Sequence, residues 1–430
     1  MPKNHAMIRT LLGLRGNPRA CVYTEPLWGI PYNLFIPYAS LYMLALGVSA
    51  QEIGLVASIG LAAQILFALL SGALTDKFGR RRTTFVVDLI SFTVPCLLWA
   101  FARDIGWFVA AALLNAVNRI AVNSWGCLLV EDSDHAQLIH IYAWIYVAGV
   151  VSAFFAPLAG LLVGGFGLVT TLRWLYLLAF VLMTAKFVLL YVFSTETRHG
   201  LARMAETRHV PLRTLLSGYR GVLGQILRAP GTLLTLFLML VTAICTLVNT
   251  TFWSVYATST VGVEARWIGI LPFVRSIVML FAFFTFVPGI RALRFRRPML
   301  AGLLLLGASQ ALLLAASSLG PVALFPSILL EGLALATISP LLDSMQVVLV
   351  DTKERARIMS ILYVCLLALS SPFGWIAGLL SGLDARLPFV LNLVLVASGM
   401  AVLFLTAAGS GSGMTEAPLP AGSRRSPPES

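Results

Sequence analysis

The sequence predicts an all-α integral membrane protein with twelve transmembrane helices, arranged as two pseudo-symmetric six-helix bundles. Hydrophobic residues make up 59% of its 430 residues and charged residues only 11%, whereas a soluble domain carries about 25% charged residues. The apolar residues fall in runs of about 20 or more, the length that crosses roughly 30 Å of hydrocarbon. Short segments of alternating polarity, which a membrane β-barrel would show, do not occur. Helices are therefore expected, because lipid requires each span to satisfy its own backbone hydrogen bonds.

Twelve spans can be placed along the chain. They are expected at 26–47, 52–74, 84–103, 107–130, 138–164, 169–194, 231–258, 264–289, 298–317, 321–349, 355–380 and 385–408. The apolar stretch before the first span is short and interrupted by Arg9 and Arg15, so a cleaved secretory signal is not expected. The five cysteines show neither metal-ligand nor disulfide spacing and are interpreted as small core residues. No metal and no cofactor is expected.

The basic residues predict the orientation in the membrane. Most of the 30 Lys and Arg residues lie in the N-terminus, the 72–84 connection, the central loop, and the connections on that same side. The opposite connections hold only Arg103, Arg173, Arg266 and Arg386. Under the positive-inside rule, both termini and the central loop are cytoplasmic, and a plasma-membrane location is expected. The net charge of +12 is therefore attributed to topology. The expected partners are the lipid bilayer and a small-molecule substrate, and not nucleic acid.

The chain divides into two halves of one plan. The sequence predicts an N-terminal bundle (1–194), a cytoplasmic central loop (195–230), a C-terminal bundle (231–408) and a disordered tail (409–430). A weak internal repeat follows this division, in which Arg80 and Arg81 fall on Arg296 and Arg297. The halves are interpreted as copies of one six-helix unit.

The connection between spans two and three reads GALTDKFGRRRTT. It matches the pattern G-x-L-x-D-K/R-x-G-R-K/R-K/R at Gly72, Leu74, Asp76, Lys77, Gly79, Arg80, Arg81 and Arg82. With twelve spans and a basic central loop, the chain resembles the major facilitator superfamily. The resemblance implies a secondary transporter, not an enzyme, in which two halves rock around a midplane site. It implies that spans 1, 4, 7 and 10 line the cavity, with spans 2, 5, 8 and 11 at its sides. A monomer is expected.

The same connection is interpreted as a gate. Gly72 and Gly79 permit close helix approach and a tight turn, and Arg80 and Arg81 hold the connection on the cytoplasmic side. The resemblance implies that Asp76 meets the N-terminal end of span eleven in the outward-open state. It also implies that Arg80 reaches the acids that end span four, Glu131 or Asp132. In the second half, Ala292 stands where the repeat would place an acid, so an asymmetric gate is expected.

Polar side chains on spans one and seven are candidates for substrate binding. The span-seven residues recur at steps of four, three, four and three, which places them on one helical face: Thr242, Thr246, Asn249, Trp253 and Tyr256. The alternative is that they bond to neighbouring helices. In span one, Tyr32, Asn33 and Tyr38 give an aromatic, polar surface, and Pro31 and Pro37 should bend the helix.

Two arginines lie near the middle of predicted spans. In span four, Asn115, Arg119 and Asn123 are spaced i, i+4, i+8, and an arginine at mid-depth must face water, an acid or an anionic ligand. Arg119 either pairs with Asp88 or Asp343 or takes part in binding or coupling. Arg275 in span eight either joins Arg119 in binding an anion or pairs with Glu331 and Asp343.

Three other charged residues within the predicted spans also have expected roles, in proton coupling or at the membrane surface. Glu331 and Asp343 in span ten are the candidates for carrying a coupling proton, because burial favours the neutral carboxylic acid. Lys186, near the cytoplasmic end of span six, is expected to extend its ammonium group to the membrane surface.

The leading functional hypothesis is proton-coupled export of a small organic molecule. It rests on the gate motif and on the stretch APLAG in span five, which is similar to the glycine–proline motif of drug–proton antiporters but has Ala156 where a glycine is expected. The alternative is proton-coupled uptake of an organic anion or nutrient, supported by Arg119 and Arg275. A membrane enzyme or receptor is a remote third possibility, because the five histidines lack metal spacing and no large extramembrane domain is present. No GxxxxGK[ST] nucleotide-binding loop occurs, so ATP is not expected to drive transport.

Overall fold

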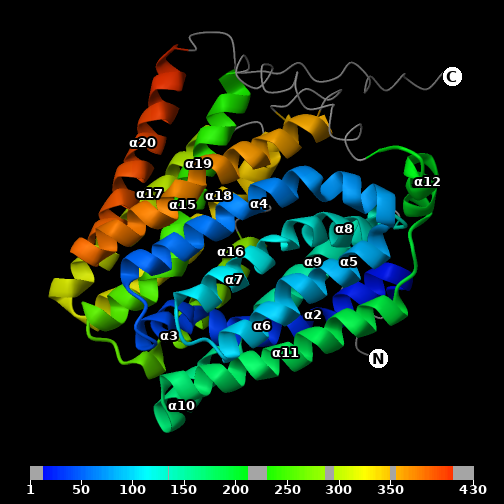
Figure 1. The fold of residues 1–430 in the computed structure, drawn as a ribbon. Coiled ribbons are helices and arrows are strands. Elements are labelled where there is room, and N and C mark those ends of the chain that lie inside the picture. Colours follow the sequence, from blue (N-terminus) through cyan, green and yellow to red (C-terminus); the bar gives the residue numbers. More distant parts are fainter. Residues whose placement is uncertain (1–12, 134, 212–229, 286–294, 349–354, 410–430) are drawn as a thin grey trace, which may run out of the picture.

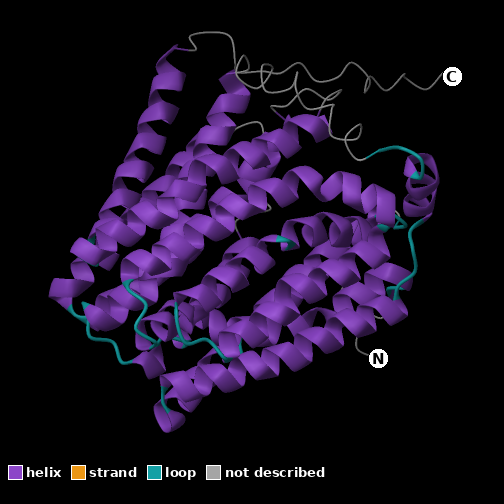
Figure 2. Ribbon diagram, viewed as in Figure 1, coloured by secondary structure: helices purple, strands orange, loops and turns teal. Residues whose placement is uncertain are grey.

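The computed structural model describes residues 13–133, 135–211, 230–285, 295–348 and 355–409. Within these ranges the secondary structure is helical and no strand occurs (Figure 2). The all-α prediction is therefore confirmed. Three predicted features lie outside the described residues: residues 212–229 of the central loop, Ala292, and residues 410–430 of the tail.

Eleven helical segments of the described chain are long and apolar enough to cross a membrane. In the first half they are α4 (Ala50–Phe78), α5 with η2 and α6 (Arg80–Asp88, Leu89–Thr93, Val94–Ala100), α7 with α8 (Ile105–Ala116, Asn118–Val130), α9 with α10 (His135–Ala153, Ala156–Phe166) and α11 (Leu168–Phe193). In the second half they are α15 (Pro230–Ser259), η4 with α16 (Ala265–Trp267, Ile270–Thr285), α17 (Arg296–Leu319), η7 with α18 (Pro321–Ala323, Leu324–Val348), α19 (Arg355–Leu383) and α20 (Leu387–Gly409).

The first expected span differs from its prediction. It consists of α2 (Gly16–Phe35), a 3₁₀ turn η1 (Ile36–Tyr38) and α3 (Ala39–Ala45), so it begins well before residue 26. Arg19 and Glu25 interrupt its apolar run, which is why hydropathy placed its start too late. The expected bend at Pro37 is present, because η1 contains that proline and separates the two helices.

The helices form two groups (Figure 1). Helices α2 to α11 make the N-terminal half, with α2 packed against α9 and α11, and α15 to α20 make the C-terminal half, with α17 packed against α18 and α20. The short helix α12 (Arg198–Thr207) follows the first half and contacts α4. The repeat register is visible in the helix starts, because α5 begins at Arg80 and α17 at Arg296.

The main contact between the halves is made by α4 and α19 near the ends that lie away from the GALTDKFGRRR connection. A Cβ at Gly54 would clash with the Gly374 carbonyl oxygen, and one at Gly378 would lie 3.0 Å from the Gly54 Cα. The Trp375 backbone N–H donates to Ser58 Oγ at 2.7 Å across the same contact. Glycine is needed here because the two backbones touch. We call this end of the molecule the closed end and the end with the motif the basic end.

A second contact joins the halves at the closed end. Tyr38 is fully buried, and its hydroxyl accepts a hydrogen bond from the Gly269 backbone N–H at 3.0 Å. A Cβ at Gly160 on α10 would clash with the Arg266 carbonyl oxygen of η4. The halves therefore meet through backbone and small side chains at one end of the molecule.

This packing predicts that a larger side chain at Gly378 opens the closed end. Gly378→Val forces a side chain against the backbone of residues 50 and 51, where even a Cβ lies 3.0 Å from each carbonyl oxygen. Overpacking costs about 1–3 kcal/mol, so the population with a separated closed end should rise roughly tenfold. The rate of maleimide labelling of Ser58→Cys measures this opening.

Gly382→Val is the matched control, since it lies one turn further along α19 and a Cβ there meets nothing within 4 Å. The chain without Ser58→Cys gives the labelling background of the native cysteines. Equal labelling rates in Gly378→Val and Gly382→Val would contradict the packing argument.

Candidate functional site

Two cavities lie between the halves. The larger has a volume of about 420 Å³ and is lined by α4, α15, α18 and α19. The smaller has a volume of about 190 Å³ and is lined by the α2–η1 segment, α15, α16 and α18. Thr250 of α15 lines both, so the cavities adjoin at this residue. The polar side chains of the larger cavity are Gln64, Thr242, Thr246, Thr250, Ser339, Asp343, Tyr363 and Ser370.

The polar face of α15 is divided between the two cavities. Thr242 and Thr246 line the larger one, and Asn249 and Trp253 line the smaller one. Tyr256 lines neither, since it is fully buried and its hydroxyl donates to the Leu313 carbonyl oxygen at 3.0 Å. The structure thus brings four of the five stripe residues to the space between the halves.

The first span contributes two of its three candidates to the smaller cavity. Tyr32 stacks on Trp28 with ring centroids 4.6 Å apart, and Asn33 donates to the Gly29 carbonyl oxygen at 2.8 Å. Tyr38 lies outside both cavities, in the contact at the closed end.

Glu331 is the buried acid of the smaller cavity. Its Oε1 accepts a hydrogen bond from Asn249 Nδ2 at 2.8 Å and lies 3.7 Å from Arg275 Nη1. Asn392 of α20 supports this arrangement by donating to Asn249 Oδ1 at 3.0 Å and to Gln310 Oε1 at 3.1 Å. The structure therefore gives Arg275 an acidic partner, and that partner is Glu331.

Asp343 is placed differently from Glu331. It is exposed on the wall of the larger cavity, near the basic end of α18. Within the described part of the chain it makes neither an ion pair nor a hydrogen bond. An ionised carboxylate in this position is available to a solute or a proton that enters the cavity.

The span-four candidates line neither of the two cavities. Arg119 of α8 lies over the ring of Tyr363 on α19, with its guanidinium carbon 4.2 Å from the ring centroid, and it has no ion pair or hydrogen bond among the described residues. Asn115 donates to the Ser91 carbonyl oxygen at 2.8 Å, within the π-helical turn η2. Asn123 donates to Thr75 Oγ1 at 3.3 Å. Arg119 nevertheless reaches the space between the halves, because Tyr363 lines the larger cavity.

Lys186 does not extend to the membrane surface, so that prediction was wrong. Its side chain is 5% exposed and its Nζ lies 3.3 Å from Glu25 Oε2. An acid within the same bundle stabilises the buried ammonium, which removes the need to reach water.

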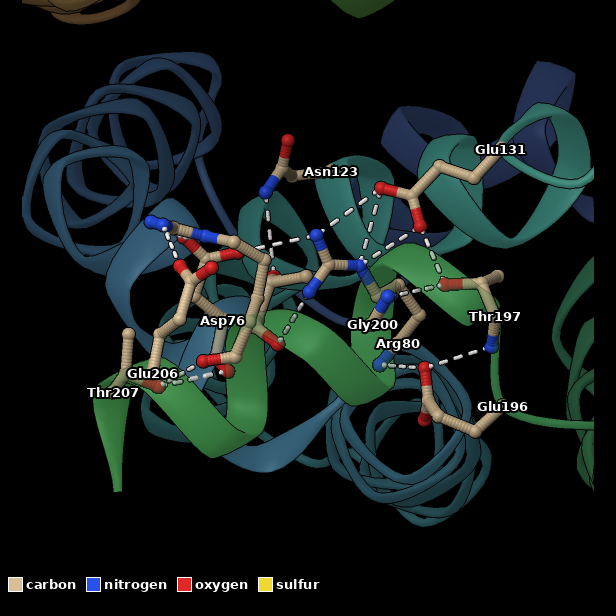
Figure 3. A network of polar contacts seen from close by, with 11 residues as sticks. Asp76, Arg80, Asn123, Glu131, Glu196, Thr197, Gly200, Glu206 and Thr207 are labelled. Atoms are coloured by element: carbon tan, nitrogen blue, oxygen red, sulfur yellow. Dashed lines mark hydrogen bonds and ion pairs between the residues drawn. The ribbon is translucent and has the colours of Figure 1, made fainter.

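The GALTDKFGRRR connection forms a polar network at the basic end (Figure 3). Arg80 is 3% exposed, its Nε donates to Glu131 Oε2 at 3.0 Å, and its Nη2 lies 3.1 Å from Asp76 Oδ1. Gly79 has φ +83° and joins α4 to α5. A Cβ at Gly72 would meet nothing within 4 Å, so this glycine has no close neighbour in the present state. Arg80 thus reaches Glu131, one of the two acids named from the sequence.

The start of the central loop completes this network. Glu196 accepts hydrogen bonds from the Arg80 and Arg81 backbone N–H groups at 2.9 and 3.0 Å, which caps the N-terminus of α5. Thr197 Oγ1 donates to Glu131 Oε2 at 2.5 Å, and the Arg203 Nη2 of α12 lies 2.8 Å from Asp76 Oδ2. Sequence reasoning missed Glu196, Thr197 and Arg203. Thr197 had a recognisable signal, because a threonine that precedes a helix is a common N-cap, and it caps α12 by accepting a hydrogen bond from the Gly200 N–H.

The remaining gate residues contact the end of α11 and the start of the central loop. Arg81 Nη2 donates to the Tyr191 carbonyl oxygen at 2.7 Å, and its guanidinium lies over the Tyr191 ring. Asp132 accepts from the Arg198 backbone N–H at 3.1 Å. The expected contact of Asp76 with span eleven belongs to the outward-open state. In this structure the partners of Asp76 are Arg80 and Arg203.

The network controls the ionisation of Glu131. Burial acts to raise its pKa, but the hydrogen bonds from Thr197 and Arg80 and the charge of Arg80 outweigh burial and hold the pKa below its usual range. A carboxyl group with a lowered folded-state pKa stabilises the fold above its ordinary pKa of about 4.3. This stabilisation is lost as the pH falls through the lowered value, so the network should remain intact at neutral pH.

Removing the charge of Glu196 should release the central loop from the gate. Glu196→Gln keeps one acceptor but loses a charged N-cap, which typically costs about 1 kcal/mol. Hydrogen exchange at the backbone amides of residues 80, 81 and 200 should therefore quicken about fivefold. Glu206→Gln is the control, because the Glu206 side chain is 61% exposed and its one partner among the described residues is Arg203. Unchanged exchange in Glu196→Gln would show that the cap does not hold the loop.

The fold is similar to those of solved transporter structures. The nucleoside transporter NupG superposes with a TM-score of 0.67 at 14% identity, covering 91% of this chain and 98% of that chain. The peptide transporter POT in complex with sulfate superposes with a TM-score of 0.66 at 15% identity, covering 94% and 97%. At these identities the likeness shows a shared fold.

Sequence comparison gives one further relative. A segment of 112 residues is 29% identical to the multi-drug resistance efflux pump PmrA of Streptococcus pneumoniae. The match covers 25% of this chain and 28% of the pump. The sequence model of the Major Facilitator Superfamily matches residues 28–291, which is more than half of the chain. The chain therefore belongs to the Major Facilitator Superfamily, and it is a multi-pass membrane transporter and not an enzyme.

Proposed function

We propose that this transporter exports a small organic molecule from the cytoplasm in exchange for protons. The observation that carries the proposal is Asp343, an acid exposed on the wall of the larger cavity without an ion pair among the described residues. A carboxylate in this position can hold either a proton or a basic solute, and exchange requires that the two compete for one site. Glu331 is less suited to this role, because Asn249 and Arg275 already hold it.

Alternating access is supported by the distribution of contacts between the halves. Their close backbone contacts lie at the closed end, where Gly54 meets Gly374 and Tyr38 meets Gly269. The positive-inside rule favours a cytoplasmic basic end, and we place the protein in the plasma membrane. With that orientation, the structure corresponds to an inward-facing state. Rocking of the halves would then separate the closed end and carry the cavity contents outward.

Two observations support the direction of transport and the kind of substrate, respectively. The segment similar to the PmrA efflux pump covers a quarter of this chain. The walls of both cavities combine hydroxyl groups with Tyr32, Trp253 and Tyr363, a composition suited to organic molecules with aromatic or basic groups.

Uptake of an organic anion is the second candidate, because of Arg119. Its guanidinium lies over the ring of Tyr363, which lines the larger cavity, and it has no acidic partner among the described residues. A carboxylate or phosphate could supply that partner.

Proton flux in proteoliposomes separates the two candidates. With a pH dye enclosed, a panel of organic cations, neutral molecules and organic anions is added in turn. Export by exchange predicts that a cation or neutral molecule moves protons in the opposite direction. Asp343→Asn should reduce this proton movement at least tenfold, while Asp104→Asn, an exposed acid that caps α7, should leave it unchanged. Protons moving with the substrate would contradict exchange, and no proton movement with any compound would contradict both candidates.

Substitution of the two arginines tests their part in the cycle. Arg119→Ala and Arg275→Ala should each abolish transport, since the first removes the unpaired cation and the second leaves Glu331 with only Asn249. Arg297→Ala, an exposed position at the start of α17, is the matched control. Expression should match the unsubstituted chain in all three. A wild-type transport rate in either cavity variant would remove that arginine from the site.

A further inference from the structure

Three charged side chains meet inside the N-terminal half, apart from the two cavities. Glu25 lies on α2, Asp88 at the end of α5 and Lys186 on α11. Lys186 Nζ lies 3.3 Å from Glu25 Oε2, and Asp88 is close enough to interact electrostatically with both. None of the three lines either cavity between the halves. We call them the N-half charge cluster.

Aromatic rings and helix backbone shield the N-half charge cluster from water. Asp88 and Lys186 are each 5% exposed. The ammonium of Lys186 lies 5.9 Å from the Trp28 ring, 5.7 Å from the Trp125 ring and 5.4 Å from the Phe187 ring. Any net charge in such surroundings is costly.

The N-half charge cluster contains one more acid than base. The thiol of Cys21 on α2, which is buried beside the cluster, adds no positive charge and so does not correct this excess. Arg81, which lines the same narrow void as Asp88, donates both Nε and Nη2 to the Tyr191 carbonyl oxygen. No described residue forms a second ion pair with the cluster. If all three groups were ionised, the cluster would carry a net charge of −1.

The two acids are held differently. Glu25 is in contact with the ammonium of Lys186, whereas Asp88 makes no ion pair and no hydrogen bond among the described residues. A buried carboxyl group without such contacts is far more stable in its neutral form. We propose that the N-half charge cluster is a proton-binding site that holds one exchangeable proton on Asp88 beside the Glu25–Lys186 ion pair.

This site goes beyond the proposed function, because Glu331 and Asp343 both lie on α18 in the other half. Helix α2 connects the N-half charge cluster to the smaller cavity. Glu25 directly precedes Pro26, where the backbone of α2 lacks one hydrogen-bond donor. The same helix carries Tyr32 and Asn33 into the smaller cavity. Release of the proton would leave a second negative charge near Lys186 and draw the ammonium away from Glu25. Because Glu25 lies on α2, a weaker Glu25–Lys186 ion pair would loosen the attachment of α2 to α11.

Infrared spectroscopy of the full chain in lipid nanodiscs detects the proton directly. Difference spectra between acidic and alkaline buffer should contain the carbonyl stretch of a protonated carboxylic acid. Asp88→Asn should remove the part of this band that belongs to one carboxyl group, and Asp88→Glu should restore it. The band should persist in Asp343→Asn and Glu331→Gln, so the result does not depend on whether the cavity acids carry protons.

Lys186→Met provides the second arm. Without the ammonium, Glu25 also becomes a buried acid without a counter-charge, so the band should increase by about the intensity of one carboxyl group. A band that is identical in the unsubstituted chain and in Asp88→Asn would overturn the proposal. So would loss of the band in Asp343→Asn alone. If Lys186→Met does not fold, the comparison of Asp88→Asn with Asp88→Glu decides the matter.

Discussion

The fold of this transporter depends on how charges are paired inside its helical halves. A charged side chain that enters the hydrocarbon region costs several kcal/mol unless a partner neutralises it. Arg80 finds Asp76 and Glu131, Lys186 finds Glu25, and Arg275 finds Glu331. Except for Arg80–Asp76, which are four residues apart, each pair joins helices that are distant in sequence, so the charges help to determine which helices become neighbours.

These ion pairs also explain why the halves can move as units. Every ion pair among the described residues lies within one half, within the start of the central loop, or between one half and the start of that loop. The contacts between the halves are of another kind, and they include touching glycines, two hydrogen bonds donated by backbone N–H groups, apolar packing with the Phe154–Phe273 ring contact, and the stacking of Arg119 on Tyr363. Separating the halves therefore breaks no ion pair among those residues, which is the property that a rocking movement requires.

The sequence was sufficient for the fold because span length and charge asymmetry are local properties. It was less informative where partners come from distant helices. The start of the first span was placed too late, because Arg19 and Glu25 look incompatible with lipid until Lys186 is seen beside Glu25. The role of Glu196 could not be read from its neighbours, since its partners lie more than a hundred positions away. The α15 stripe was easier, because helical spacing alone places its residues on one face.

Among the described residues, two charged side chains at the boundary between the halves remain without an ion pair. Within the described chain, Arg119 of the first half and Asp343 of the second have no oppositely charged partner; Asp343 lines the larger cavity, and Arg119 lies over the ring of Tyr363, which lines the same cavity. A bound solute or proton that neutralises either charge recovers the free energy that the unpaired charge costs. Because they belong to different halves, a solute that contacts both would favour the approach of the halves around it. Charge pairing within each half of the described chain thus leaves Arg119 and Asp343 as two unpaired charges at the boundary between the halves, where a bound solute can neutralise them.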